Sequence, residues 1–191
     1  MARRKSISDE MVLKAAATVM FAKGPSDFTL ADVAAAAGIA PSTLIQRFGD
    51  KRRLIVAAIA HDNHRFIQSL RALPAGTGVE AVIAVFRMLF PDVDDAGADA
   101  FADQLLWLRQ DMRDPDLNRL ARERFQVLRT VIAERLPTLP LPPAAAALLV
   151  EAQWQGALIQ WGIAREGRLT DFVSQSLKAW FWLVGAKAPA G

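Results

Sequence analysis

Two short helices joined by a glycine turn are the strongest feature of this chain, and they lie within residues 29–48. Val33 and Ala37 lie at helical spacing, and Gly38 can adopt the left-handed conformation that ends a helix. Pro41 suits the first turn of the helix that follows. The spacing therefore predicts a helix-turn-helix motif, and DNA is the first candidate partner.

The second helix of this motif has an inner and an outer set of side chains. Leu44 and Phe48 lie one helical turn apart and would face the interior. The remaining side chains would lie around the outward faces, where they could enter a major groove: Ser42, Thr43, Ile45, Gln46 and Arg47. Ser42 and Gln46 are the candidates for hydrogen bonds to base edges.

The run from Phe28 to Leu54 resembles the N-terminal domain of TetR-type transcriptional regulators (the TetR/AcrR family). The residues that carry the resemblance are Ala37, Gly38, Ile39, Thr43, Leu44, Phe48 and Lys51. An apolar stripe typical of a helix precedes them at Val12, Ala15, Ala16, Val19 and Met20. The sequence Phe21-Ala22-Lys23-Gly24 ends this helix as first helices of the family usually end. The match covers roughly the first third of the chain.

The resemblance implies specific contacts with DNA. Thr43, Arg47 and Lys51 stand at positions that contact phosphates in the family, and Thr29 joins the predicted DNA-binding residues. Ile45 departs from the family pattern, which usually has an aromatic residue there. Isoleucine cannot donate a hydrogen bond, but it can pack against a thymine methyl group. The operator sequence is therefore open.

The charge is divided unevenly along the chain. Residues 1–71 hold 11 Lys and Arg against 6 Asp and Glu, a net +5, whereas residues 72–191 hold 12 against 14, a net −2. Arg3–Lys5 precede the first helix and Lys51–Arg53 follow the second helix of the motif, so phosphate neutralisation is their predicted role. The alternative for Arg3–Lys5 is a disordered, solubilising arm.

Composition argues against several other classes of protein. The chain of 191 residues has no cysteine and no tyrosine, which excludes disulfides and thiolate metal sites. No catalytic residue is predicted, so we do not expect an enzyme. His61 and His64 share a helix face with no evident third ligand, and neither a metal nor a cofactor is predicted. The chain start lacks a signal-peptide core and no segment suits a membrane span, so we expect a protein of the reducing cytoplasm.

The rest of the chain is also predicted to be helical. Turn-forming residues interrupt it at 74–78, 91–97, 113–115, 137–143 and 166–169, and strand signals are weak throughout. We therefore expect an all-α fold of about nine helices, with a three-helix DNA-binding domain in residues 1–53. Residues 54–191 would form a larger helical domain for ligand binding and dimerisation.

The last two predicted helices each carry an apolar stripe. Small residues in the first of them would permit a close approach between helices, and two such helices per chain could form a four-helix dimer interface. The alternative is that both stripes face the core of a monomer, but the family resemblance favours a homodimer. The predicted interface residues are Ala152, Gly156, Ile159, Val173, Leu177 and Trp180, with Trp180 as the anchor.

The middle of the chain is rich in large apolar side chains. By resemblance, this region would enclose a small-molecule pocket, although a plain packed core is the alternative for each residue. Because few charges lie near these positions, we expect a hydrophobic or aromatic ligand. The predicted ligand-binding residues are Phe66, Phe86, Gln104, Trp107, Leu108, Trp154 and Trp161.

Together these features predict a ligand-responsive regulator of transcription. As a homodimer it would bind an inverted-repeat operator in double-stranded DNA, act as a repressor, and be released by a small apolar or aromatic effector. The alternative is a protein of the same fold that binds a lipid or apolar small molecule without sequence-specific DNA binding.

Overall fold

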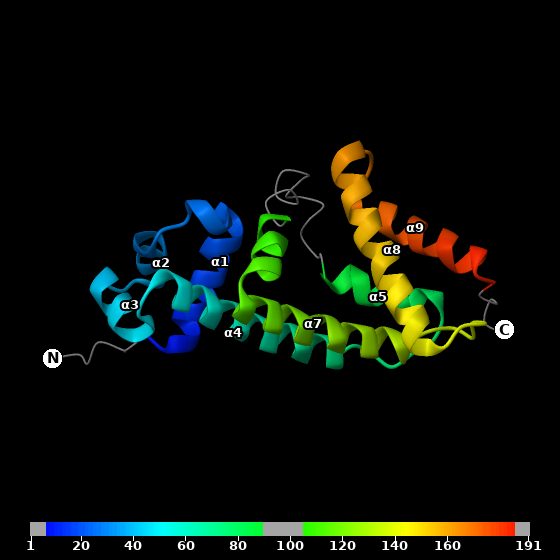
Figure 1. Cartoon of the computed structure of the whole chain (residues 1–191), viewed down its shortest axis with the longest axis horizontal. Helices are drawn as coiled ribbons and strands as arrows, with labels where there is room; N and C mark the ends of the chain where they lie inside the picture. The colour runs from blue at the N-terminus through cyan, green and yellow to red at the C-terminus, as the bar shows by residue number, and fades with distance from the viewer. Residues whose placement is uncertain (1–6, 90–104, 186–191) are drawn as a thin grey trace. The chain divides into compact units, whose positions relative to one another are not determined.

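The structure, a computed structural model, describes residues 7–89 and 105–185 (Figure 1). Helices joined by turns form all of this part, and no strand occurs in it. The eight helices with defined bounds are α1 (Asp9–Asp27), α2 (Leu30–Ala37), α3 (Pro41–Phe48), α4 (Lys51–Arg71), α5 (Val79–Leu89), α7 (Pro115–Ala133), α8 (Pro143–Ala164) and α9 (Leu169–Leu183). Residues 105–113 are helical as well. The predicted all-α fold of about nine helices is confirmed.

The chain divides into two compact units. Unit 1 consists of residues 1–66 and 103–123, and unit 2 of residues 67–102 and 124–191. Helices α4 and α7 therefore each contribute residues to both units. The boundary that the sequence places between residues 53 and 54 lies inside α4.

The predicted turn between the second and third helices is present in unit 1. Gly38 adopts the left-handed conformation (φ 67°, ψ 32°), and its N–H donates to Ala34 and Ala35 at the end of α2. The N–H of Ile39 also donates to the carbonyl of Ala34, at 3.0 Å. Pro41 is the first residue of α3, as expected from its fixed φ. Glycine is favoured at position 38 because residues with a Cβ rarely adopt this left-handed conformation.

Helix α1 begins after Ser8, whose hydroxyl accepts a hydrogen bond from the N–H of Met11. Its helical path is broken at Gly24 (φ 78°, ψ 165°), although the helix is assigned as far as Asp27. The sequence places the end of this helix at Gly24, so the predicted end coincides with the break.

The core of unit 1 is formed by more than the first four helices. Leu44 from α3 and Leu54 from α4 are buried against α1 and α2. Trp107, Leu117 and Leu120 belong to the same buried cluster. The helical segment 105–113 and the first turns of α7 therefore complete this core, which explains why they belong to unit 1.

Arg52 joins the start of α4 to the start of α7 within unit 1. Its guanidinium donates to both carboxylate oxygens of Asp114, at 2.8 and 3.1 Å, and to Asp116 at 2.7 Å. Asp114 also accepts hydrogen bonds from the backbone N–H groups of Asp116 and Leu117, so it caps α7. The hydrogen bond from Arg52 lowers the pKa of Asp114 below its usual value.

Unit 2 is built from α5, α8, α9 and the parts of α4 and α7 that belong to it. Helix α9 packs against both α8 and α5. Arg135, which is buried just after α7, donates to the carbonyls of Val131, Leu73 and Pro74 and so ties the end of α7 to the chain that follows α4. None of the helices in the described residues is long and apolar enough to cross a membrane.

The capping interaction at the start of α2 should make stability depend on pH. Asp32 accepts from Lys23 at 2.7 Å and from the N–H of Thr29, and the hydrogen bond from Lys23 is the main reason that the pKa of Asp32 falls from 3.8 to about 2. A carboxyl group whose pKa is lower in the folded state stabilises the fold at pH values above its unfolded-state pKa. This stabilisation is lost as the pH falls through the folded-state pKa.

We therefore expect Asp32→Asn to lower the unfolding midpoint by about 2 °C at neutral pH. The difference from the parent protein should shrink as the pH falls from 3.8 toward 2 in thermal melts followed by circular dichroism. Asp27→Asn is the control, because Asp27 is exposed. A difference that stays constant over this pH range would contradict a contribution from the Asp32 charge.

Candidate DNA-binding site

Helix α3 presents an exposed face, and its opposite face is packed in the core of unit 1. Ser42, Ile45 and Gln46 are exposed, and 51% of the Ile45 surface is accessible. Leu44 is buried in the core of unit 1, and Phe48 packs against the same core, as the spacing predicts. The outward face of α3 therefore offers a hydroxyl, an amide and an aliphatic group on a fixed helix. Such a set can read base edges by hydrogen bonding and by apolar contact.

Of the two threonines of the predicted site, Thr29 belongs to a capping box at the start of α2. Thr29 is the N-cap of α2: its hydroxyl accepts from the N–H of Asp32 at 3.1 Å and donates to the Asp32 carboxylate at 2.8 Å. The Asp32 side chain accepts from the Thr29 N–H in return, which completes a capping box. Thr43 is half-buried on α3. Thr29 thus has a structural role in starting α2.

Arg47, a predicted phosphate contact, is engaged within unit 1. Its Nε donates to the Asp9 carboxylate at 2.7 Å, its Nη2 donates to the same oxygen, and its Nη1 donates to the carbonyl of Ile7 at 3.0 Å. Only 24% of the Arg47 side chain is exposed. No local sequence pattern indicates this pair, because Asp9 and Arg47 lie far apart along the chain.

Lys51, the other cation expected at a phosphate, also has partners inside unit 1. Its Nζ donates to the carbonyl of Phe28 at 2.7 Å and lies 3.5 Å from that of Ser26. The ammonium also lies 4.1 Å from the centre of the Phe28 ring, a cation–π contact. The Ser26 carbonyl lies in the last turn of α1 and the Phe28 carbonyl just after it, where a cation is favourable. Lys51 therefore fastens the end of α1 to the start of α4.

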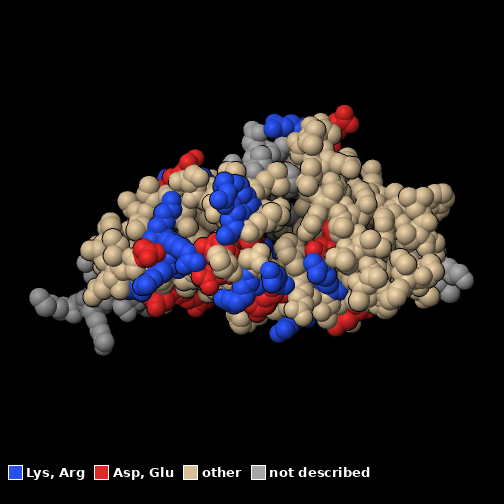
Figure 2. Space-filling model, viewed as in Figure 1, with Lys and Arg blue, Asp and Glu red and all other residues tan. Residues whose placement is uncertain are grey.

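Basic and acidic side chains alternate over unit 1. On the face drawn in Figure 2, Lys and Arg lie next to Asp and Glu in the region of α1–α4, whereas most of the surface of unit 2 is neither basic nor acidic. Arg52 is paired with Asp114 and Asp116, while the side chain of Arg53 is 75% exposed and lies 3.8 Å from Asp50. Arg52 of this basic end is thus paired with carboxylates that lie outside residues 1–71.

The predicted ligand-binding residues are divided between the two units. Phe86 and Trp154 are buried in unit 2 with ring centres 5.0 Å apart, and Trp161 is buried there too, donating to the Gly167 carbonyl. Trp107 and Leu108 belong to unit 1. Phe66 is half-buried and is the last residue of the first segment of unit 1, and Gln104 lies outside the described residues. The hollow beside Phe86 measures only about 10 Å³, so these rings form packed core.

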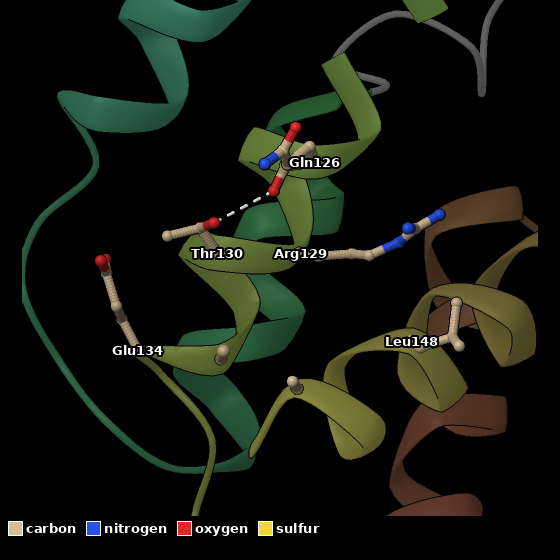
Figure 3. A pocket seen from close by; sticks show the side chains of 7 residues that line it. Gln126, Arg129, Thr130, Glu134 and Leu148 are labelled. Atoms are coloured by element: carbon tan, nitrogen blue, oxygen red, sulfur yellow. Dashed lines mark hydrogen bonds between the residues drawn. The ribbon is translucent and has the colours of Figure 1, made fainter. Parts of the chain in front are cut away.

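A larger hollow of about 560 Å³ lies between α7 and α8 in unit 2 (Figure 3). None of the predicted ligand-binding residues lines it; the lining residues are Gln126, Arg129, Thr130, Ala133, Glu134, Ala144 and Leu148. Arg129 donates to the buried Glu151 of α8 at 2.7 Å, and Glu151 raises the pKa of Arg129. The walls thus combine apolar groups with polar ones, which include the anchored cation of Arg129 and the carboxylate of Glu134. Periodicity could not reveal this site, because its residues lie on exposed helix faces.

The predicted dimer residues fall into two groups in unit 2. Ala152 and Ile159 are exposed on α8, and Gly156 lies beside them with open space where a Cβ would stand. Val173 and Leu177 of α9 are buried within the unit, so they face its core and are not on the surface. Trp180 is partly exposed and contacts Phe181 edge-on, with ring centres 5.0 Å apart.

Comparison with known proteins agrees with this geometry. Residues 12–58 match the sequence profile of bacterial regulatory proteins of the tetR family. This stretch includes most of α1, the Gly38 turn and the whole of α3. The chain matches no curated protein sequence.

Solved structures of similar fold include regulators and ligand complexes. A transcriptional regulator from Rhodococcus sp. Rha1 has a TM-score of 0.75 at 18% identity, covering 93% of this chain and 95% of that one. The multidrug binding protein EbrR in complex with proflavin has a TM-score of 0.62 at 21% identity, with 89% and 97% covered. The transcriptional regulator FadR from Bacillus subtilis, in complex with stearoyl-CoA, has a TM-score of 0.63 at 14% identity, with 95% and 100% covered.

Helices α2 and α3, with the left-handed turn at Gly38 between them, form a helix-turn-helix, and the described helices share the fold of solved transcriptional regulators. The tetR-family sequence pattern at residues 12–58 and a fold shared with solved TetR-family regulators confirm the resemblance seen in the sequence. DNA binding and regulation are the activities expected for this family.

The position of Lys51 leads to a prediction about stability. Lys51→Met removes the ammonium but keeps an aliphatic chain over Phe28, so the carbonyls of Ser26 and Phe28 lose their donor. We expect a loss of about 1 kcal/mol, which corresponds to a fall of about 3 °C in the unfolding midpoint. Arg53→Met is the control, because Arg53 is far more exposed. Equal midpoints for the Lys51 variant and the parent, measured by calorimetry, would show that this contact does not stabilise unit 1.

Proposed function

We propose that the protein is a ligand-responsive repressor that binds an inverted-repeat operator as a homodimer and is released by a small apolar or aromatic effector. The observation that supports this most directly is the face of α3, where Ser42, Ile45 and Gln46 are exposed while Leu44 anchors the helix in the core. On this proposal unit 1 reads DNA, and unit 2 dimerises and binds the effector. Such a regulator would work in the cytoplasm, where its DNA lies.

The chemistry of the exposed residues suggests what the helix reads. A glutamine amide suits adenine, whose N6 and N7 offer a donor and an acceptor, and the Ile45 side chain suits the methyl group of thymine. A serine hydroxyl can pair with either a donor or an acceptor. We therefore expect A·T pairs in each half-site beneath Ile45 and Gln46.

A homodimer is supported by an uncovered apolar surface on unit 2. Leu149, Ile159 and Ile163 of α8 and Trp182 and Leu183 of α9 are all exposed large apolar residues. Because large apolar side chains are unfavourable in water, we propose that these residues meet the same residues of a second copy. Two reading helices about 34–36 Å apart would then enter successive major grooves.

The hollow between α7 and α8 is the place we propose for the effector. Its volume of about 560 Å³ lies within the range of small-molecule sites. An apolar ligand would pack against Leu148 and Ala133, and a polar group on it could accept from Arg129 (Figure 3). Such a ligand would release DNA only to the extent that it binds the DNA-free conformation more tightly than the DNA-binding one.

One observation favours a second candidate function. Arg47 and Lys51, the cations expected to contact phosphates, both have internal partners, and Ile45 replaces an aromatic residue. A protein of this fold that binds a lipid or apolar small molecule, without sequence-specific DNA binding, would tolerate these features. The two candidates differ in whether the protein selects a DNA sequence.

Selection of fragments from a genomic or random DNA library tests this choice. At physiological salt, the parent protein should enrich an inverted repeat. Gln46→Ala should then lose about 1–3 kcal/mol on that sequence and relax the preference at one base pair of each half-site. Gln68→Ala is the control, because Gln68 is exposed on α4 in unit 2. Binding that is weak, sensitive to salt and without enrichment would favour the ligand-binding alternative.

The proposed dimer is tested by the state of the free protein. Trp182 is 79% exposed on α9, so Trp182→Glu should leave the fold intact but place a charge in the interface. Sedimentation velocity should show the parent as a dimer and the variant as a monomer, or a dissociation constant raised at least tenfold. Met112→Glu, at a residue of unit 1 that is 69% exposed, is the matched control. A parent protein that sediments as a monomer would contradict the proposal.

A further inference from the structure

A second hollow lies in unit 2 beside the end of α7, and we name it the Arg135 hollow. Its volume is about 240 Å³, and its lining comes from the end of α4, the last turns of α7 and the two residues that follow α7. Leu70, Val127 and Val131 supply an apolar wall, and two arginines and a glutamate supply charge. The hollow therefore joins an apolar surface to a concentration of ionised groups.

Arg135 carries a buried positive charge whose hydrogen-bond partners are all neutral. Only 9% of its side chain is exposed. Its guanidinium donates to the carbonyls of Val131, Leu73 and Pro74, at 3.1, 3.3 and 3.4 Å. These three bonds leave two of the five N–H donors of a guanidinium for other partners. Because arginine stays protonated, the burial of this charge has a cost that an anion in the hollow would reduce.

One carboxylate lies near this charge but is not hydrogen-bonded to it. The Oε2 atom of Glu134 is 3.7 Å from Nη1 of Arg135, and 64% of the Glu134 side chain is exposed, so water screens this pair. Arg52 and Arg129 are both more exposed than Arg135, yet each donates to a carboxylate at 2.7 or 2.8 Å. The most buried of these three cations thus has the weakest counter-ion.

The second cation of the hollow is Arg71, the last residue of α4, whose side chain is exposed. Arg135 is already fixed, because its backbone N–H donates to Ile132 and its carbonyl accepts from the N–H of Gly78, both at 2.9 Å. An anion in the hollow would therefore meet one guanidinium held in place and a second on an exposed side chain. Binding to a group that is already ordered costs little conformational entropy.

We propose that the Arg135 hollow binds a small carboxylate with an apolar body, such as an aromatic acid. A carboxylate matches the paired donors of a guanidinium, and the apolar body packs on Leu70, Val127 and Val131. The volume of about 240 Å³ limits the ligand to a small acid. This site goes beyond the proposed function and does not depend on DNA binding.

The Arg135 hollow is separate from the hollow between α7 and α8. The two share Thr130 and Glu134, but Arg129 lines only the hollow between α7 and α8. Figure 3 shows Arg129 extending from α7 toward α8, whereas Thr130 and Glu134 leave α7 on the other side of the view. The carboxylate of the proposed ligand therefore binds Arg71 and Arg135, and not Arg129.

Benzoate is the probe for this site, and its binding to the full chain is measured by titration calorimetry. We expect one benzoate per chain. Benzyl alcohol and benzylammonium keep the ring without the negative charge, and inorganic phosphate keeps negative charge without the ring. Each should bind at least about tenfold more weakly than benzoate. Absence of benzoate binding, or phosphate binding as tight as that of benzoate, would overturn the proposal.

Two variants of exposed residues should change benzoate affinity in opposite directions. Arg71→Gln removes a cation and should weaken binding about fivefold. Glu134→Gln removes a carboxylate that repels the ligand and should strengthen binding about twofold. Arg135 is unsuitable for this test, because its loss would also leave the carbonyls of Leu73 and Pro74 without their donor. Unchanged affinity in Arg71→Gln, or weaker binding in Glu134→Gln, would contradict a carboxylate in this hollow.

Two further variants show where benzoate binds. Arg122→Gln removes an equal charge from an exposed position of α7 that belongs to unit 1, so benzoate affinity should not change. Leu148→Ala alters the wall of the hollow between α7 and α8 alone, and it too should leave benzoate affinity unchanged. A loss in Leu148→Ala would assign benzoate to the other hollow, and a loss in Arg122→Gln equal to that in Arg71→Gln would reduce the effect to net charge. Either result would overturn the inference and leave the proposed DNA binding untouched.

Discussion

The left-handed turn at Gly38 is the constraint on which unit 1 depends. It ends α2, satisfies two carbonyls of that helix, and sends the chain directly into α3 at Pro41. Once α3 leaves in this direction, Leu44 enters the core shared with α1 and α4, and Ser42 and Gln46 must face outward. A bulkier residue at Gly38 would be strained by its φ of 67°. The face proposed to read DNA is therefore a consequence of one backbone conformation.

Several charged residues of α3 and α4 bind partners within unit 1. Arg47 holds the start of α1, Lys51 holds its end, and Arg52 joins the start of α4 to α7 through Asp114. Each pair is partly exposed, so its contribution to stability is modest, but together they fix the relative positions of four helices. The number of basic residues near a helix-turn-helix therefore does not give the number of phosphate contacts. Cations that already have partners within unit 1 are less available to DNA phosphates.

Local sequence patterns predicted the turn, the buried Leu44 and the all-α fold, because these depend on residues a few positions apart. Such local patterns do not predict contacts between segments that are distant in the sequence. Asp9 and Arg47 meet only once α1 and α3 are packed. Trp107 belongs to the core of unit 1, although the large apolar side chains in the middle of the chain suggest a ligand pocket there. Periodicity also finds an apolar stripe without saying what covers it: Val173 faces the core of unit 2, whereas stripe residues of α8 face outward.

Placing a cleavage reagent on the reading helix tests the central claim most directly. The chain has no cysteine, so Gln46→Cys creates a unique site for an iron-chelate reagent that cuts DNA nearby. Bound to a selected fragment, the labelled protein should cut in two clusters about 10 base pairs apart or a multiple of that spacing, one in each half-site. The parent protein treated with the same reagent should cut nothing. Cutting spread evenly along the fragment would contradict the account, because α3 would then not occupy a fixed place in the groove.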